Sequence, residues 1–134
     1  MIYTVKSPIL GFETTEKLEF TRVDEMFATV KDADREYPSF TLVNPYVLRN
    51  GYSFDIPMPI SVLLDVKPDS KVNVYSILVV QQPIENSVVN FLAPLIFNED
   101  NQTVAQVVLS SNEYPTFGVA EEIAEYLKLA TATA

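Results

Sequence analysis

The sequence of 134 residues contains neither cysteine nor histidine. Without cysteine the chain has no disulfide, no thiolate nucleophile and no cysteine-based metal site. Without histidine it lacks the side chain that most often serves as a general base and as a transition-metal ligand. We therefore expect no metal and no cofactor, and this inventory does not favour an enzyme.

Positive charge is also scarce, because nine Lys and Arg residues stand against 18 Asp and Glu residues, a formal net charge of −9. Such a protein repels phosphate groups, so we expect no direct contact with nucleic acid. The charge suits a soluble protein or one that meets a basic protein partner.

Glycines and long apolar runs are few as well. Only three glycines occur, and the chain has no GxGxxG, GxxxxGK[ST] or GxSxG motif. No apolar run reaches the roughly 18 residues that span a bilayer. The first residues, MIYTVKSPIL, lack the basic and apolar regions of a secretory signal. We expect a cytoplasmic protein that makes no contact with membranes.

The chain does contain enough apolar residues, 48% of the total, for the core of one domain. Alternating or β-branched runs predict a small domain built mostly of strands. These runs lie at residues 2–6, 17–23, 26–30, 39–45, 71–82, 87–98 and 102–110. Residues 57–66 predict a short helix with Pro59 near its first turn.

Residues 119–130 predict an amphipathic helix near the C-terminus, with Val119, Ile123 and Leu127 on one stripe. Glu121 and Glu122 would lie in its first turn and Lys128 in its last, as the helix dipole favours. We expect this helix to pack on the β-domain of residues 1–118, and residues 131–134 to form a frayed tail.

The runs SVVNFLAPLIFN (87–98) and QTVAQVVLS (102–110) predict a hairpin around the turn NEDN. With Asn98 opposite Asn101, Phe97 faces Gln102, Ala93 faces Gln106 and Pro94 faces Ala105. One face of the first strand is wholly apolar and predicts the core side. It carries Phe91, Ala93, Leu95 and Phe97.

The opposite face of that strand carries Asn90, Pro94, Ile96 and Asn98. We expect it to face solvent or a partner unless a bulge at Pro94 reverses the alternation. Together with the acidic turn, these are our candidate protein-interaction residues: Asn90, Pro94, Ile96, Asn98, Glu99 and Asp100. The alternative is that the two asparagines only hold the strand and its turn.

Other chemistries find weaker support. Paired carboxylates for glycoside hydrolysis would need acids such as Asp55 and Glu85 in one cleft, and both lie beside proline-containing turns that favour a solvated loop. The oxygen-rich run 98–101 lacks the spacing of an EF-hand, so a plain hairpin turn is favoured. A small-ligand-binding barrel and an acid-based hydrolase stay open as alternatives.

Several short motifs, in order along the chain, resemble the flagellar assembly factor family, FliW. The most specific is an Asn-(Leu/Phe)-x-Ala-Pro-x-(Ile/Val)-x-Asn stretch. The matching residues are Gly11, Phe12 and Glu13; Asn44 and Pro45; Tyr52, Phe54, Ile56 and Pro57; Asn90, Phe91, Ala93, Pro94, Ile96 and Asn98; Gln106 to Leu109; and Tyr114 and Pro115. The resemblance extends from about residue 2 to residue 118.

The resemblance implies a compact, mainly antiparallel β-barrel with short helices and a regulatory, non-catalytic role. Proteins of this family bind newly made flagellin in the cytoplasm, and also CsrA, a small basic repressor of flagellin translation. Once flagellin is exported, the freed factor binds CsrA away from the RNA-contacting surface. Its effect on CsrA is therefore allosteric. The resemblance therefore implies flagellin and CsrA as partners of a protein that is a monomer when free.

Overall fold

The computed structural model describes residues 1–10, 13–36 and 38–126. The strands in these ranges are β1 (Ile2–Val5), β2 (Lys17–Arg22), β3 (Phe27–Asp32), β4 (Ser39–Val43), β5 (Val72–Val79), β6 (Val88–Val89), β7 (Leu95–Asn98), β8 (Thr103–Gln106) and β9 (Glu121–Glu122). The short helical elements are α1 (Pro45–Leu48), α2 (Met58–Leu63) and the 3-10 turn η1 (Ile84–Asn86).

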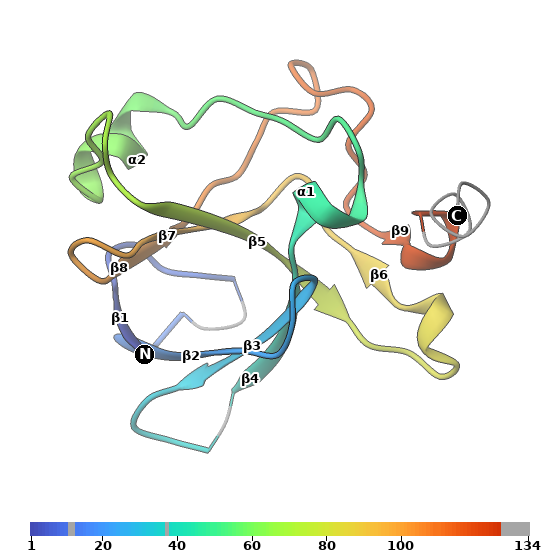
Figure 1. The fold of residues 1–134 in the computed structure, drawn as a ribbon, viewed down its shortest axis with the longest axis horizontal. Coiled ribbons are helices and arrows are strands. Elements are labelled where there is room, and N and C mark those ends of the chain that lie inside the picture. The colour runs from blue at the N-terminus through green and yellow to red at the C-terminus, as the bar shows by residue number, and fades with distance from the viewer. Residues whose placement is uncertain (11–12, 37, 127–134) are drawn as a thin grey trace.

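Seven strands close into a barrel in the order β4-β3-β2-β1-β8-β7-β5, and β5 pairs back onto β4 (Figure 1). The neighbouring pairs are antiparallel except β1–β8, where Thr4 lies opposite Thr103. Beyond the barrel, β6 pairs with the end of β5, and β9 pairs with β6. The prediction of a mainly β, barrel-like domain with short helices is confirmed, with one parallel pair that the alternation of residues did not indicate.

The barrel interior is filled by one apolar cluster. Aromatic rings occupy its centre, with Phe97 lying 4.9 Å from Tyr3 and 5.1 Å from Phe20 between ring centroids. The other buried members are Ile9, Leu18, Ala28, Val30, Leu42, Tyr75, Leu95 and Val104. This packing of side chains argues against the alternative of a barrel that encloses a small ligand.

A second apolar layer covers the outer face of β7 and β8. Ile96 and Ala105 point away from the barrel interior, since their neighbours in sequence point into it. Leu64, which directly follows α2, is fully buried against this face. The other members are Val107 and Leu109, with half-buried side chains that include Phe54, Ile56, Ile60, Leu92, Tyr114 and Phe117. Strand β7 is therefore buried on both faces.

One of the two short α-helices was predicted and the other was not. The helix expected at 57–66 is confirmed as α2, with proline in its first turn. Helix α1 was not predicted, because Asn44-Pro45 was interpreted as a strand end. The Asn44 side chain accepts hydrogen bonds from the backbone of Tyr46 and Val47, so Asn44 is an N-cap followed by proline at the first helical position.

The predicted start of the C-terminal helix, at residue 119, is wrong. Glu121 and Glu122 form β9 rather than a first helical turn, because they pair with β6, and helical structure begins only at Ile123. Ile123 is fully buried and Tyr126 packs on the same apolar cluster, so this short segment does pack on the barrel. Residues 127–130, with Leu127 and Lys128, and the tail 131–134 lie outside the described residues.

Candidate functional site

The β7–β8 hairpin contains most of the predicted interaction residues, and it is far more buried than the sequence indicated. Ile96 has 0% of its surface exposed and Asn98 1%, while Pro94 is buried and Asn90 half-buried. The predicted solvent exposure of this face is wrong, because α2 and the segments around it cover the outside of the barrel. Alternation of residues identified the face correctly but could not reveal the layer that packs on it.

The predicted register of the hairpin is also wrong. Asn98 lies opposite Thr103, and Ile96, rather than Pro94, lies opposite Ala105. The loop is therefore two residues longer than expected, and it includes Gln102 in the left-handed region with φ 55°. At the start of this longer loop the Asn98 side chain folds back, and its Oδ1 accepts a hydrogen bond from Asp100 N at 3.1 Å.

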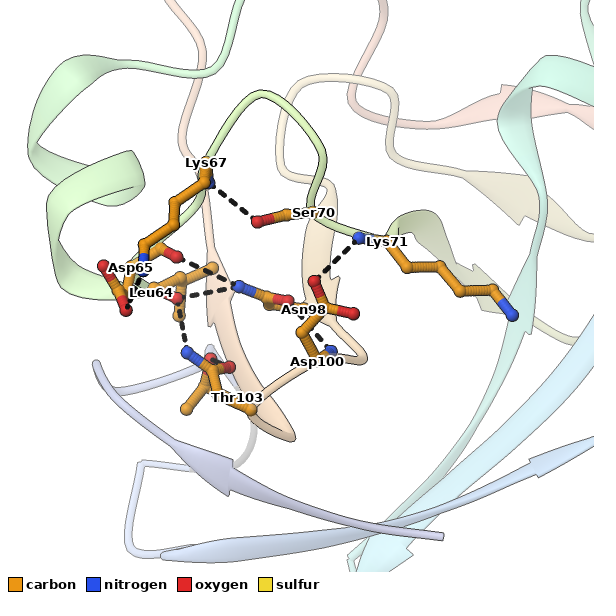
Figure 2. Close-up of polar contacts among 9 residues, drawn as sticks. Leu64, Asp65, Lys67, Ser70, Lys71, Asn98, Asp100 and Thr103 are labelled. Atoms are coloured by element: carbon orange, nitrogen blue, oxygen red, sulfur yellow. Dashed lines mark hydrogen bonds and ion pairs between the residues drawn. The ribbon is translucent and has the colours of Figure 1, made fainter.

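The Asn98 side chain links the hairpin to the end of α2 (Figure 2). Its Nδ2 donates to the carbonyl oxygen of Leu64 at 2.9 Å, and Asn101 Nδ2 donates to the same oxygen at 2.8 Å. Carbonyls at a helix C-terminus lack partners within the helix, so these two amides satisfy one of them. Asn98 therefore holds the outer layer on the barrel, in agreement with the alternative that the asparagines have a structural task.

Asn90 and Pro94 also make contacts within the fold. Asn90 Oδ1 accepts from the backbone N–H of Leu92 at 2.9 Å, which closes a local turn. The Pro94 carbonyl accepts from Val107 N at 2.9 Å, while proline itself has no N–H to return. These contacts explain why polar and cyclic residues interrupt an apolar run.

The acidic tip of the hairpin is the part of the prediction that reaches solvent. Asp100 is exposed, and its Oδ2 accepts from the backbone N–H of Lys71 at 3.2 Å. Glu99 is half-buried and lies 3.4 Å from Lys71 Nζ. One lysine therefore accompanies two carboxylates, and the tip keeps a net negative charge.

Gln106 joins the signature strand, by which we mean residues 90–98 of the family pattern, to the N-terminal region. Its Nε2 donates to the Ala93 carbonyl at 3.2 Å, and its Oε1 accepts from the Leu10 backbone at 2.9 Å. Gly11 and Phe12, the first of the matching motif residues, lie outside the described residues.

A polar and aromatic junction at the other end of the barrel was not predicted. The Arg49 guanidinium lies 5.1 Å from the ring centroids of Phe91 and Phe117 and 5.7 Å from that of Tyr126. It also forms an ion pair with Glu121 at 3.2 Å. Cation–π contacts strengthen when the cation is partly removed from water, as Arg49 is here. We call these five residues the Arg49 junction.

Glu121 is the acceptor at the centre of the Arg49 junction. It also accepts from the backbone N–H of Gly118 at 2.6 Å and from the hydroxyl of Tyr126. Burial, followed by this hydrogen bond to Glu121, raises the pKa of Tyr126 to about 12, so its hydroxyl stays a neutral donor. The junction fastens the segment 116–126 to the barrel, and the sequence offered no signal for it beyond a lone arginine.

Tyr52 explains another part of the family pattern. Its hydroxyl donates to the Phe91 carbonyl at 2.8 Å, and its ring lies 4.6 Å from that of Phe117 between centroids. Burial raises the pKa of Tyr52 above its ordinary value. The motif residues Tyr52 and Phe91 are thus direct neighbours that join two distant segments.

The described residues show no arrangement of acids that indicates metal or hydrolytic chemistry. Within them, no three of the Asp and Glu side chains gather in a way that could hold a metal ion. Asp55 and Glu85 are both exposed and belong to separate segments, as a solvated-loop interpretation requires. No helix in the described ranges is long and apolar enough to cross a membrane.

Comparison with known proteins gives consistent matches over nearly the whole chain. The family model described as FliW protein matches residues 1–118. "Flagellar assembly factor FliW 1" of Wolinella succinogenes is 53% identical over 128 residues, which cover 96% of this chain and 99% of that protein. "Flagellar assembly factor FliW 2" of the same organism is 47% identical over 126 residues, covering 94% and 92% of the two chains. A crystal structure of the flagellar assembly factor FliW shares the fold, with a TM-score of 0.81 at 20% identity over 91% of this chain and 84% of that chain.

Proposed function

This chain belongs to the FliW family of flagellar assembly factors, and we propose that it binds flagellin and, when free of flagellin, the translational repressor CsrA. In this proposal the protein has no catalytic step. Export of flagellin frees the protein, the freed protein captures CsrA, and flagellin translation resumes. The protein acts in the cytoplasm and is a monomer when free.

Family membership is the observation that carries the proposal, and the distribution of charge supports it. From Val72 to Tyr126 the chain has seven acidic residues and no Lys or Arg. They are Glu85, Glu99, Asp100, Glu113, Glu121, Glu122 and Glu125. A basic protein such as CsrA is attracted to this part of the chain, whereas RNA is repelled by it.

A translation assay with purified components tests the cycle. Flagellin messenger RNA is translated with CsrA present, and this protein is then added alone or with an excess of purified flagellin. We expect the protein to restore flagellin synthesis and added flagellin to abolish that restoration. Continued repression in the presence of the protein, or restoration that flagellin does not reverse, would contradict the proposal.

The allosteric part of the proposal needs its own control. A CsrA variant with the side chains of its RNA-contacting surface replaced is titrated with this protein in parallel with unmodified CsrA. We expect the same affinity for both, because the proposed contact lies away from the RNA surface. A large loss of affinity in the variant would indicate that the protein occupies the RNA-binding surface instead.

A further inference from the structure

A groove lies between the segment that precedes α2 and the segment that follows β8. It measures about 310 Å³, and its apolar lining includes Ile56, Pro57, Leu109 and Tyr114. The two segments are tied together where the Tyr114 hydroxyl accepts from Asp55 N at 3.0 Å. In Figure 1 both segments run along the top of the view, to the right of α2.

One wall of the groove is a strand edge that no described residue covers. Val107 N donates to the Pro94 carbonyl at 2.9 Å and Leu109 N to the Leu92 carbonyl at 2.7 Å, which continues the β7–β8 register beyond Gln106. Backbone groups alternate in direction along a strand, so the N–H and C=O of Val108 point to the opposite edge. Neither group has a hydrogen-bond partner among the described residues.

Strand β1 covers this edge along β8, but it does not extend as far as Val108. β1 pairs with β8 through Val5 and Val104, and its last backbone bond to that strand joins Lys6 N to the Val104 carbonyl. The Val108 side chain is 72% exposed beside the free backbone groups. An exposed edge of this kind is a template for another strand.

The rim of the groove is acidic. Asp55 and Glu113 both line it, and no Lys or Arg from the described part of the chain does. Neither carboxylate forms an ion pair with another described residue. The groove therefore combines an apolar floor, a free backbone donor and acceptor, and two uncompensated negative charges.

We propose that this groove binds an extended segment of a partner protein, in which an apolar side chain lies next to Lys or Arg, by adding that segment as a strand at Val108. Main-chain hydrogen bonds to an open edge favour an extended partner, because the backbone groups of a helix are already paired. The acidic rim selects a basic segment over an acidic one. The inference rests on the proposed function only for the natural source of that segment, which would be CsrA.

Two synthetic peptides test the groove without any natural partner. One alternates valine with lysine over eight residues, and the other alternates valine with glutamate. The ¹⁵N-labelled protein is titrated with each at low salt, and hydrogen exchange of the Val108 amide is followed. With the lysine peptide at ten times its Kd, exchange of that amide should slow about ten-fold, since exchange then needs the free form. The glutamate peptide should have no such effect.

Substitutions separate the backbone contact from the charge. Val108→Pro removes the free N–H and should weaken lysine-peptide binding roughly ten-fold, the upper range for one hydrogen bond. Asp55→Asn with Glu113→Gln should weaken it about five-fold at low salt and little at high salt. Val119→Pro is the matched control, because Val119 is also an exposed valine and is not part of the groove lining. Thermal melts must show that all three variants fold.

Equal binding of the two peptides, an unprotected Val108 amide, or undiminished binding by folded Val108→Pro would each overturn the proposal. If Val108→Pro does not fold, the double charge variant decides by the same measurement. CsrA is then titrated against the same proteins. Failure of CsrA to bind the unmodified protein rejects the proposed function, while the peptide results decide the groove independently. Undiminished CsrA binding by both groove variants overturns the assignment of the groove to the basic partner.

Discussion

Residues 92–98 and residues 107–109 lie side by side in one ladder, and they differ in exposure at one position, because Val107 and Leu109 are buried whereas Val108 is exposed. The first segment contains the most specific part of the family pattern and is covered on both faces. The second belongs to the same pattern, yet Val108 is 72% exposed and its backbone has no hydrogen-bond partner among the described residues. A family signature therefore identifies the segments that define the fold without distinguishing which of them can meet a partner.

The difference between the two segments arises from what packs outside the barrel. The α2 layer covers β7 because Leu64 and its neighbours are held there by Asn98 and Asn101. The edge at Val108 lies past the point where β1 leaves β8, so no described strand covers it. Five predictions test this division between the buried signature and the exposed parts of the molecule.

The largest effect is expected from the two faces of β7. Phe97→Ala should cost about 3–5 kcal/mol of unfolding free energy and Ile96→Ala about 2–5 kcal/mol, since both side chains are fully buried. Chemical denaturation measures both. Any loss of partner binding should follow the folded fraction alone. A stable Ile96→Ala protein that binds its partner weakly would place Ile96 at the interface. That result would contradict the assignment of β7 to the buried part of the molecule.

The next effect tests whether Asn98 holds the outer layer. Asn98→Ala should cost about 1–3 kcal/mol, because it removes a buried donor to the Leu64 carbonyl and the acceptor for the Asp100 N–H. Asn101→Ala should cost less, since Asn101 is exposed and Asn98 still satisfies the Leu64 carbonyl. Urea denaturation compares the two variants. Equal costs would contradict a special role for the buried amide.

These two segments also show how far the sequence could predict the structure. Strand positions and α2 follow from alternation, apolar content and proline placement, which are local signals, whereas the barrel was implied by the family resemblance. The burial of Ile96 and Asn98 depends on a layer that comes from residues 54–66, about 30 positions away in the chain. Spacing within one strand carries no information on that contact, so the exposure was predicted wrongly although the face was identified correctly.

The Arg49 junction shows the same limit in a different form. Glu121 matches the first turn of a helix in composition, but its pairing with β6 and its ion pair with Arg49 are long-range contacts. The N-cap signal at Asn44-Pro45 is the opposite case, because it is local and a closer examination of capping would have predicted α1.

A smaller effect is expected from the Arg49 junction, which tests whether a half-buried cation outside the signature also stabilises the fold. Arg49→Lys keeps the charge but loses the planar stack on Phe91 and Phe117, and should cost about 1–2 kcal/mol. Limited proteolysis should cut the segment after Phe117 sooner than in the unmodified protein. Unchanged stability and cleavage would show that the aromatic rings hold this segment without the cation.

A pH titration extends the comparison to Asp32, a buried carboxylate on β3. The Thr15 hydroxyl, the Asp34 backbone N–H and Arg35 hold the pKa of Asp32 below its ordinary value of 3.8. A depressed pKa contributes stability above the unfolded value that is lost as the pH falls through the folded one. Unfolding free energy should therefore fall less between neutral pH and pH values below 3.8 in Asp32→Asn than in the unmodified protein. Parallel curves for the two proteins would contradict this role.

The smallest effect on stability is expected at the exposed tip of the same hairpin, where the signature strand ends. Glu99→Gln with Asp100→Asn keeps an oxygen acceptor for Lys71 N and should change unfolding free energy by less than about 0.5 kcal/mol. Its effect should appear in kinetics, because the tip keeps a net negative charge that attracts a basic partner. Stopped-flow measurements should show slower association with CsrA at low ionic strength and no difference at high salt.

Asp34→Asn with Glu36→Gln removes the same charge from an exposed turn elsewhere and is the control. If both double variants slow association equally, the total charge rather than the hairpin tip attracts the partner, and if neither does, steering by charge is excluded.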